Sequence, residues 1–308
     1  MIAPNALFKV GIVGCGKVGM SAAYALFLQG GATEIVLHGR DKQKVLGEKY
    51  DLEHALPFVE EVDITATDSY EDLAGCHVIV YTAGAPQKEG ETRLDLCVNN
   101  RAILEEALPQ IHQHAPDAVI LMVANPVDIL THIANEIIPD AKGRIFGSGT
   151  TLDTARFRYH LSKHIQVNAR SIHAYVLGEH GDSSFPVFEH ATIGGKRLLD
   201  FTEFTPEVIQ DAYIQARDAA YNIIATKGAS YYAIGVVISR IVKTILSDAR
   251  TVLPVSVPLH NYYGHSDVSL SVPCIVGSSG IVQVLETDLS EQEQEGLARS
   301  VEALKKFC

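Results

Sequence analysis

The stretch GIVGCGKVG, residues 11–19, decides the fold of this chain. An apolar run precedes it, and a run rich in alanine and leucine follows it. This order predicts a buried strand, a tight glycine turn and a helix. In such a turn Gly14, Gly16 and Gly19 let the backbone approach a pyrophosphate, which the N-terminus of the helix attracts. The stretch therefore predicts a dinucleotide-binding unit, and a tight turn without a ligand stays open as the alternative.

Apolar strands alternate with helical stretches through the rest of the first half of the chain. Strands are expected at residues 8–13, 34–37, 62–65, 77–82 and 118–123. Helices are expected at residues 20–30, 42–54 and 99–114. Strands that are apolar throughout and alternate with helices are typical of a parallel sheet covered on both faces. Residues 1–148 are therefore expected to form a doubly wound α/β domain of the Rossmann type.

The pattern changes after about residue 148. Helices are expected at residues 152–162, 206–226, 231–247 and 290–307, and strands at residues 252–259, 271–276 and 281–285. The last helix opens on Ser290 with Glu293 three positions later, which is a capping-box pattern. Residues 149–308 are expected to form a mixed α+β substrate domain. Because no linker separates the two halves, we expect them to pack closely.

Composition excludes several classes of protein. The chain has 308 residues, of which 47% are hydrophobic and 20% charged, as in ordinary globular proteins. Its net charge of -12 argues against a nucleic-acid partner, since such binders present a basic face. No apolar run is long enough to span a bilayer, and the first residues lack the features of a signal peptide. The five cysteines form no CxxC pair, so a cytoplasmic protein with reduced thiols is expected.

Three further stretches carry side chains that could converge on a small acid: AGAPQKEGETRLDL from Ala83, LDTARFR from Leu152 and GEHGDSS from Gly178. A histidine with an aspartate behind it is a general acid/base unit. An arginine fork binds a carboxylate at two points, which a lysine cannot do. His160 and His164 have a spacing that suits a metal, but they lack further ligands. They are interpreted as solvated, and no metal is expected.

Together with ANPVD around Asn125, these stretches resemble the lactate/malate dehydrogenase family, in order and over essentially the whole chain. Within it, the bacterial lactate enzymes are most similar. The resemblance implies reversible hydride transfer between NAD(P)H and a 2-oxo acid, with pyruvate giving L-lactate. A malate or other 2-hydroxy acid dehydrogenase is the nearest alternative, and a non-catalytic dinucleotide-binding protein is a remote one.

The resemblance also assigns catalytic roles to matching residues. His180 would give a proton to the ketone oxygen, with Asp153 paired to its ring. Arg156 would hold the substrate carboxylate. Arg93 would polarise the carbonyl from a loop that closes and excludes water. Asn125 would help place His180 and the carbonyl. Without the resemblance, His180 could be structural, Arg156 a surface ion pair and Arg93 a solvated loop residue.

The same resemblance places substrate and cofactor contacts. Gln87 matches the position where malate enzymes carry an arginine for a second carboxylate; an amide cannot offset that charge, which favours pyruvate, although Lys88 lies next to it. Ser230 stands where lactate enzymes usually carry threonine, so the pocket could admit a larger 2-oxo acid. The expected cofactor contacts are Gly14, Gly16, Val18, Gly19, Gly39, Arg40, Gly84, Ala85 and Ser148.

One cofactor position departs from the usual pattern. About 20 residues beyond the glycine turn, a carboxylate normally binds the adenine ribose of NAD. Here Gly39 and Arg40 occupy that place. Glycine removes the repulsion against the 2′-phosphate of NADP, and the arginine could pair with it, with His38 as a further donor. NAD or NADP is expected, and NADP is favoured. The alternatives are a solvated Arg40, or Asp41 reaching back to the ribose of NAD.

Two cationic positions suggest regulation. Arg158 and His173 match residues that bind fructose 1,6-bisphosphate at a subunit interface in regulated bacterial members of the family. An ordinary interface or solvated pair is the alternative. Activation would require the sugar phosphate to bind the active form more tightly. The resemblance implies a homotetramer, with a dimer second.

Overall fold

A computed structural model describes residues 7–85 and 93–307 of the chain. The predicted substrate residue Gln87 and its neighbour Lys88 lie outside the described residues, as does the side chain of Arg93.

Within the described residues, the larger sheet has nine strands in the order β12-β11-β10-β6-β5-β4-β1-β2-β3. Its parallel part runs from β6 to β3, which is the strand order of a doubly wound dinucleotide-binding sheet. These strands are β1 (Lys9–Val13), β2 (Glu34–His38), β3 (Asp63–Thr67), β4 (Val78–Tyr81), β5 (Val119–Met122) and β6 (Ile145–Gly147). The predicted Rossmann sheet is confirmed.

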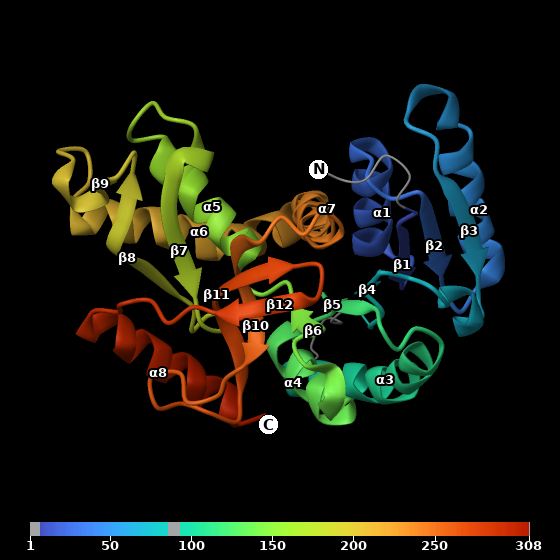
Figure 1. Ribbon diagram of the computed structural model, residues 1–308. Helices are drawn as coiled ribbons and strands as arrows, with labels where there is room; N and C mark the ends of the chain where they lie inside the picture. The colour runs from blue at the N-terminus through green and yellow to red at the C-terminus, as the bar shows by residue number, and fades with distance from the viewer. Residues whose placement is uncertain (1–6, 86–92, 308) are drawn as a thin grey trace.

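Helices cover both faces of this sheet (Figure 1). The α-helices of the described residues are α1 (Lys17–Gln29), α2 (Lys42–Glu53), α3 (Arg93–His114), α4 (Val127–Ile137), α5 (Thr151–Ser162), α6 (Pro206–Lys227), α7 (Tyr232–Leu246) and α8 (Glu291–Lys305). Helix α1 packs on α7, α3 on α4 and α5 on α6. Since α7 comes from the second half of the chain, the α1–α7 contact joins the two halves, as expected from the missing linker.

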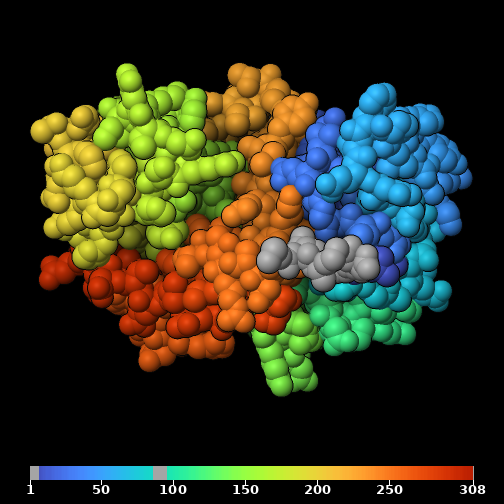
Figure 2. Space-filling model, turned by 45° about the horizontal axis from the view of Figure 1, so that its top comes forward, coloured from blue at the N-terminus to red at the C-terminus, as the bar shows by residue number. Residues whose placement is uncertain are grey.

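The second half adds antiparallel strands to the same sheet. They are β10 (Thr251–Pro258), β11 (Ser269–Gly277) and β12 (Gly280–Val284). Strand β10 meets β6 through the pair Ser256 and Gly147, so the sheet continues past the boundary expected at residue 148. Figure 2 shows the orange part of the chain, which includes α7, lying between the green and yellow part and the blue part.

The smaller sheet was not expected from the sequence. It consists of β7 (Ile172–Leu177), β8 (Phe185–Ile193) and β9 (Lys196–Arg197), all antiparallel. Strand β8 contains few fully buried positions, so its side chains do not form the continuous apolar run that marks a central strand. Helix α4 and the short strand β6 were missed as well. Asn125 and Pro126 precede α4, and a proline before a helical stretch is as typical of a turn as of a helix start.

The carboxyl ends of the parallel strands position the site. Gly14 follows β1, Gly39 follows β2, Gly84 follows β4 and Asn125 follows β5 at this edge. In open α/β sheets ligands bind outside the carboxyl ends of the strands. The fold therefore brings loops that are far apart in the sequence to one edge of the sheet.

Candidate active site

The glycine turn has the geometry that a pyrophosphate requires. Gly14 has φ +103°, a conformation that side-chain-bearing residues rarely adopt. A Cβ on Gly19 would overlap the carbonyl oxygen of Gly14, whereas a Cβ on Gly16 would meet no atom within 4 Å. Gly19 is thus needed for packing inside the turn, and Gly16 keeps its outer side open. Val18 is half-buried against the core and carries the turn into α1. These features fit a bound dinucleotide.

The turn after β2 differs from one that binds an adenine ribose through a carboxylate. Gly39 donates its N–H to Thr67, and a Cβ there would come within 2.8 Å of Val45 Cγ2. Arg40 is exposed and forms no ion pair with any described residue. The Asp41 carboxylate accepts the backbone N–H of Lys44 at 3.2 Å, which caps the N-terminus of α2. Asp41 is therefore engaged in the helix cap, and Arg40 is free to bind an anion.

His38 does not take part in this surface. It is 3% exposed, and its ring stacks on Tyr70 with 4.2 Å between centroids. Neither ring nitrogen has a hydrogen-bond partner among the described residues. Burial lowers the pKa of His38, so the ring is neutral at physiological pH. The expectation that His38 donates to a phosphate is wrong, because strand alternation turns its side chain into the protein.

The loops after β4 and β5 are held by one side chain. Asn100, from α3, accepts the N–H of Ala85 at 2.7 Å through its Oδ1 atom. Its Nδ2 atom donates to the carbonyl oxygen of Asn125 at 2.7 Å. A Cβ on Gly84 would lie 3.1 Å from this amide, so glycine leaves room for it. Gly84, Ala85 and Asn125 thus lie close together. Sequence analysis did not identify Asn100, because no local motif marks a helix residue that reaches two loops.

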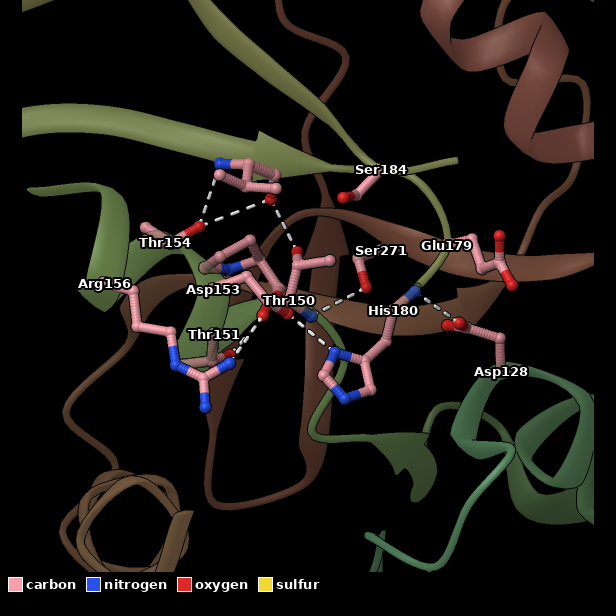
Figure 3. Close-up of polar contacts among 12 residues, drawn as sticks. Asp128, Thr150, Thr151, Asp153, Thr154, Arg156, Glu179, His180, Ser184 and Ser271 are labelled. Atoms are coloured by element: carbon pink, nitrogen blue, oxygen red, sulfur yellow. Dashed lines mark hydrogen bonds and ion pairs between the residues drawn. The ribbon is translucent and has the colours of Figure 1, made fainter. Parts of the chain in front are cut away.

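The acid/base residues meet in the second half of the chain (Figure 3). Asp153, in the first turn of α5, lies 2.6 Å from His180 Nδ1 through its Oδ2 atom. Its other oxygen accepts a hydrogen bond from Arg156 Nη1 at 3.2 Å. Asp153 and Arg156 are three positions apart on one helix, which brings both side chains to the same face. The structure therefore brings these three predicted residues together around one carboxylate.

Charge and burial set the protonation of this cluster. The Asp153 charge raises the pKa of His180; burial opposes this, and the hydrogen bond that the ring donates to Asp153 and the Asp128 charge add to it. Burial raises the pKa of Asp153, but His180 and Arg156 more than offset that effect, so its pKa lies below the ordinary value. An ionised Asp153 fixes the proton of the ring on Nδ1. The Nε2 edge of His180 points away from Asp153 and has no partner among the described residues (Figure 3).

Four further predicted positions lie outside the cluster of His180, Asp153 and Arg156. Ser148 is buried after β6, and its N–H donates to Met122. Ser230 is half-buried between α6 and α7. Arg158 donates from Nε to the carbonyl oxygen of Ala174 at 2.8 Å, and exposed His173 precedes that residue on β7. None of these positions forms a hydrogen bond with His180 in the structure.

No metal site accompanies the cluster in the parts of the chain that the structure describes. There, no three His, Cys, Asp or Glu side chains are grouped to hold an ion. Within the same described residues, no helix is long and apolar enough to cross a membrane.

Family models match both halves. Residues 8–147 match the NAD binding domain of lactate/malate dehydrogenase, and residues 150–308 match its α/β C-terminal domain. The chain is a lactate/malate dehydrogenase family member. Curated relatives agree with this assignment. One from Salinibacter ruber, named L-lactate dehydrogenase, is 46% identical over 301 residues, 96% of this chain and 95% of the relative. One of the same name from Clostridium botulinum is 41% identical over 310 residues, 99% and 97% of the two chains.

Solved structures of family members have the same fold. A lactate dehydrogenase from a deep-sea metagenome library of the Medee basin superposes with a TM-score of 0.94, at 38% identity and 98% coverage of both chains. A minor L-lactate dehydrogenase from Enterococcus mundtii also gives a TM-score of 0.94, at 37% identity, covering 98% of this chain and 97% of that one. These full-length matches confirm the predicted family, the predicted fold and the predicted activity of an L-lactate dehydrogenase.

Proposed function

We propose that this L-lactate dehydrogenase reduces pyruvate to L-lactate with NADPH in preference to NADH. The observation that carries the proposal is the turn after β2. Its only long side chain free of the helix cap is the exposed Arg40, and Gly39 offers no carboxylate to the ribose. A charge-assisted hydrogen bond from a guanidinium to a phosphate contributes about 1.5–3 kcal/mol. No carboxylate at position 39 repels the 2′-phosphate.

The chemistry follows from the acid/base cluster. When bound, the nicotinamide cofactor supplies the hydride for the ketone carbon. His180 holds a proton on Nε2, the edge that Asp153 leaves free, and gives it to the ketone oxygen. Asp153 keeps the ring in place and stabilises its charged form. Arg156 uses one N–H on Asp153 and directs its remaining donors at the substrate carboxylate. Asn125 positions the carbonyl from the loop that Asn100 holds.

The remaining expected contacts complete the substrate site. Gln87 and Arg93 would contact the substrate, and Ser230 would form a wall of the pocket from the α6–α7 junction. We expect pyruvate turnover to exceed oxaloacetate turnover, because an amide at position 87 leaves a second carboxylate unpaired. If oxaloacetate is the better substrate, the malate alternative replaces this assignment. Bound cofactor without turnover of any 2-oxo acid would support the non-catalytic alternative.

The test of the cofactor proposal compares Arg40→Ala with Lys42→Ala. Lys42 is a matched control because it lies two positions away and pairs with Asp68 at 3.3 Å. We expect Arg40→Ala to lower kcat/KM with NADPH roughly 10- to 100-fold and to leave kcat/KM with NADH unchanged. Lys42→Ala should change neither. Unchanged NADPH kinetics in Arg40→Ala would overturn the proposal and leave NAD as the cofactor.

We also propose regulation by fructose 1,6-bisphosphate at Arg158 and His173. The Arg158 guanidinium lies over the Tyr175 ring, 5.1 Å from its centroid, and donates its Nε–H to Ala174, which fixes the plane of a group suited to bind a phosphate. His173 adds an exposed imidazole from β7. Titration with the sugar phosphate should lower the KM for pyruvate in the wild type and have no effect in His173→Ala. An unchanged KM in the wild type would remove the proposal.

The assembly proposed is a homotetramer, with a dimer second. Large apolar side chains stay exposed on adjacent helices: Tyr24 and Leu28 on α1, and Tyr232 and Val236 on α7, all more than half exposed. Such a contiguous apolar surface favours association. Sedimentation equilibrium measures the mass, and a monomer would contradict the proposal. We place the enzyme in the cytoplasm, consistent with the burial of Cys15, Cys76 and Cys274, which form no disulfide.

A further inference from the structure

Asp128 links the two sides of the active site. It lies in the first turn of α4, three residues after Asn125, and is 2% exposed. Its Oδ2 atom accepts the backbone N–H of His180 at 2.7 Å, across 52 positions of sequence. Figure 3 shows Asp128 on the side of His180 opposite to Asp153 and Arg156. The acid/base residue is thus held by Asp153 at its ring and by Asp128 at its backbone.

The Asp128 carboxylate has little else to stabilise its charge. Its Oδ1 atom is buried and meets no donor with ordinary hydrogen-bond geometry among the described residues, although the Ser256 hydroxyl lies close enough to favour the charged form. Burial raises the pKa of Asp128 to about 6, while Ser256 and the N–H of His180 act in the opposite direction. An amide could accept the same N–H without the cost of burying a charge. Anchoring the backbone alone therefore does not account for a carboxylate here.

The charge acts on the ring of His180. The charged groups that act on His180 are Asp153 and Arg156 on α5 and Asp128 on α4. Asp153 and Asp128 favour the protonated ring, and Arg156 opposes it. Glu179 acts on Asp128 by like-charge repulsion, which favours the neutral acid. With pKa about 6, Asp128 is ionised at pH 7 and above, where its charge supports that of His180.

We infer that Asp128 is a positioning residue that fixes the backbone of His180 relative to Asn125 and, through its charge, keeps His180 protonated for pyruvate reduction. The inference rests on the proposed acid/base role of His180. It has two separable parts, because the hydrogen bond needs only an acceptor whereas the effect on protonation needs a charge. Variants of Asp128 can remove one part without the other.

The experiment records kcat/KM for pyruvate reduction and for lactate oxidation against pH, for the wild type, for four variants at Asp128 and Glu293, and for His180→Gln. Asp128→Asn keeps an acceptor and removes the charge; Asp128→Ala removes both. Asp128→Ser serves as a second neutral variant if the asparagine variant does not fold. Glu293→Gln is the matched control, since Glu293 is a buried carboxylate that accepts backbone N–H groups of Phe188 and Glu189, on β8. Circular dichroism and the fluorescence of bound NADPH report folding and cofactor binding.

We expect Asp128→Asn to move the loss of reduction activity at high pH to lower pH, with about a threefold loss at pH 8. Lactate oxidation, which needs the neutral ring, should shift in the same direction. Asp128→Ala should lose a further factor of roughly ten at every pH. Glu293→Gln should follow the wild-type profile.

Three results would overturn the assignment, each at a different point. If the pH profile of folded Asp128→Asn coincides with that of the wild type, the charge has no role and the inference fails. If His180→Gln retains wild-type turnover, the proposed role of His180 fails first, and Asp128 has nothing to position. Shifts of equal size in Glu293→Gln would also contradict the inference, because they would show that any buried carboxylate has this effect.

Discussion

The cofactor edge of the large sheet and the acid/base cluster are built in different ways. At the edge, the part of the site that fits a pyrophosphate consists of backbone: glycines at strand ends and the N-terminus of α1. In the cluster, one carboxylate, Asp153, holds two other side chains. A substitution in a backbone site acts through the space that is available to the added Cβ atom. A substitution in a side-chain site acts through the charge that it removes. The two regions should therefore fail in different ways when single residues change.

The largest effect is expected where one group serves two partners. Asp153→Asn should lower kcat roughly 10²- to 10⁴-fold, because an amide cannot stabilise the protonated His180 ring. The KM for pyruvate should rise as well, since Arg156 loses its ion-pair partner. Steady-state kinetics at pH 7 measure both. A kcat within tenfold of the wild type would mean that the carboxylate is not the centre of the cluster.

The glycine turn offers the opposite case, in which space decides the outcome. Gly19→Ala places a methyl group against the Gly14 carbonyl and should lower the free energy of unfolding by about 1–3 kcal/mol. Gly16→Ala has open space and should fold normally, but the Kd for cofactor should rise roughly tenfold. Chemical denaturation and NADPH fluorescence separate these effects. Equal destabilisation by both variants would show that the turn is only structural.

The pH dependence should separate the two regions without any substitution. His180 must be protonated to reduce pyruvate, and its pKa is raised by Asp153. Reduction should therefore persist above the ordinary histidine range and then fall by about tenfold per pH unit, while lactate oxidation rises. The Kd for NADPH should not follow this profile. A Kd that changes with the same midpoint would indicate that the two regions titrate together.

The smallest effect concerns the helix cap beside Arg40. Asp41→Ala should lower the free energy of unfolding by about 0.5–2 kcal/mol, because the N–H of Lys44 loses its acceptor. The KM for NADH should stay unchanged, since the carboxylate is engaged in the cap. Thermal denaturation and NADH kinetics provide the two measurements. A rise in the NADH KM would show that Asp41 reaches the ribose after all.

The same contrast explains how much the sequence predicted. The glycine turn, the parallel strands and most helices follow from local patterns, although α1 begins at Lys17 rather than residue 20 because glycines obscure its first turn. The cluster was predicted only through family resemblance, since nothing in the spacing between Asp153 and His180 fixes their contact. The pairing of β10 with β6 was not predicted either, because strands that lie far apart in the sequence carry no local signal for pairing. Asp128 lies within the ANPVD stretch, yet its partner is a backbone group, which carries no sequence signal.

Asn100 couples the positions of the loops after β4 and β5. The Asn100 amide accepts the N–H of Ala85 and donates to the carbonyl oxygen of Asn125. Asn100 belongs to α3, a helix of 22 residues. Neither loop can shift without stretching its hydrogen bond to Asn100, the residue that also holds the other loop. A ligand that displaces Ala85 should therefore also displace Asn125, because the side chain of Asn100 connects the two residues.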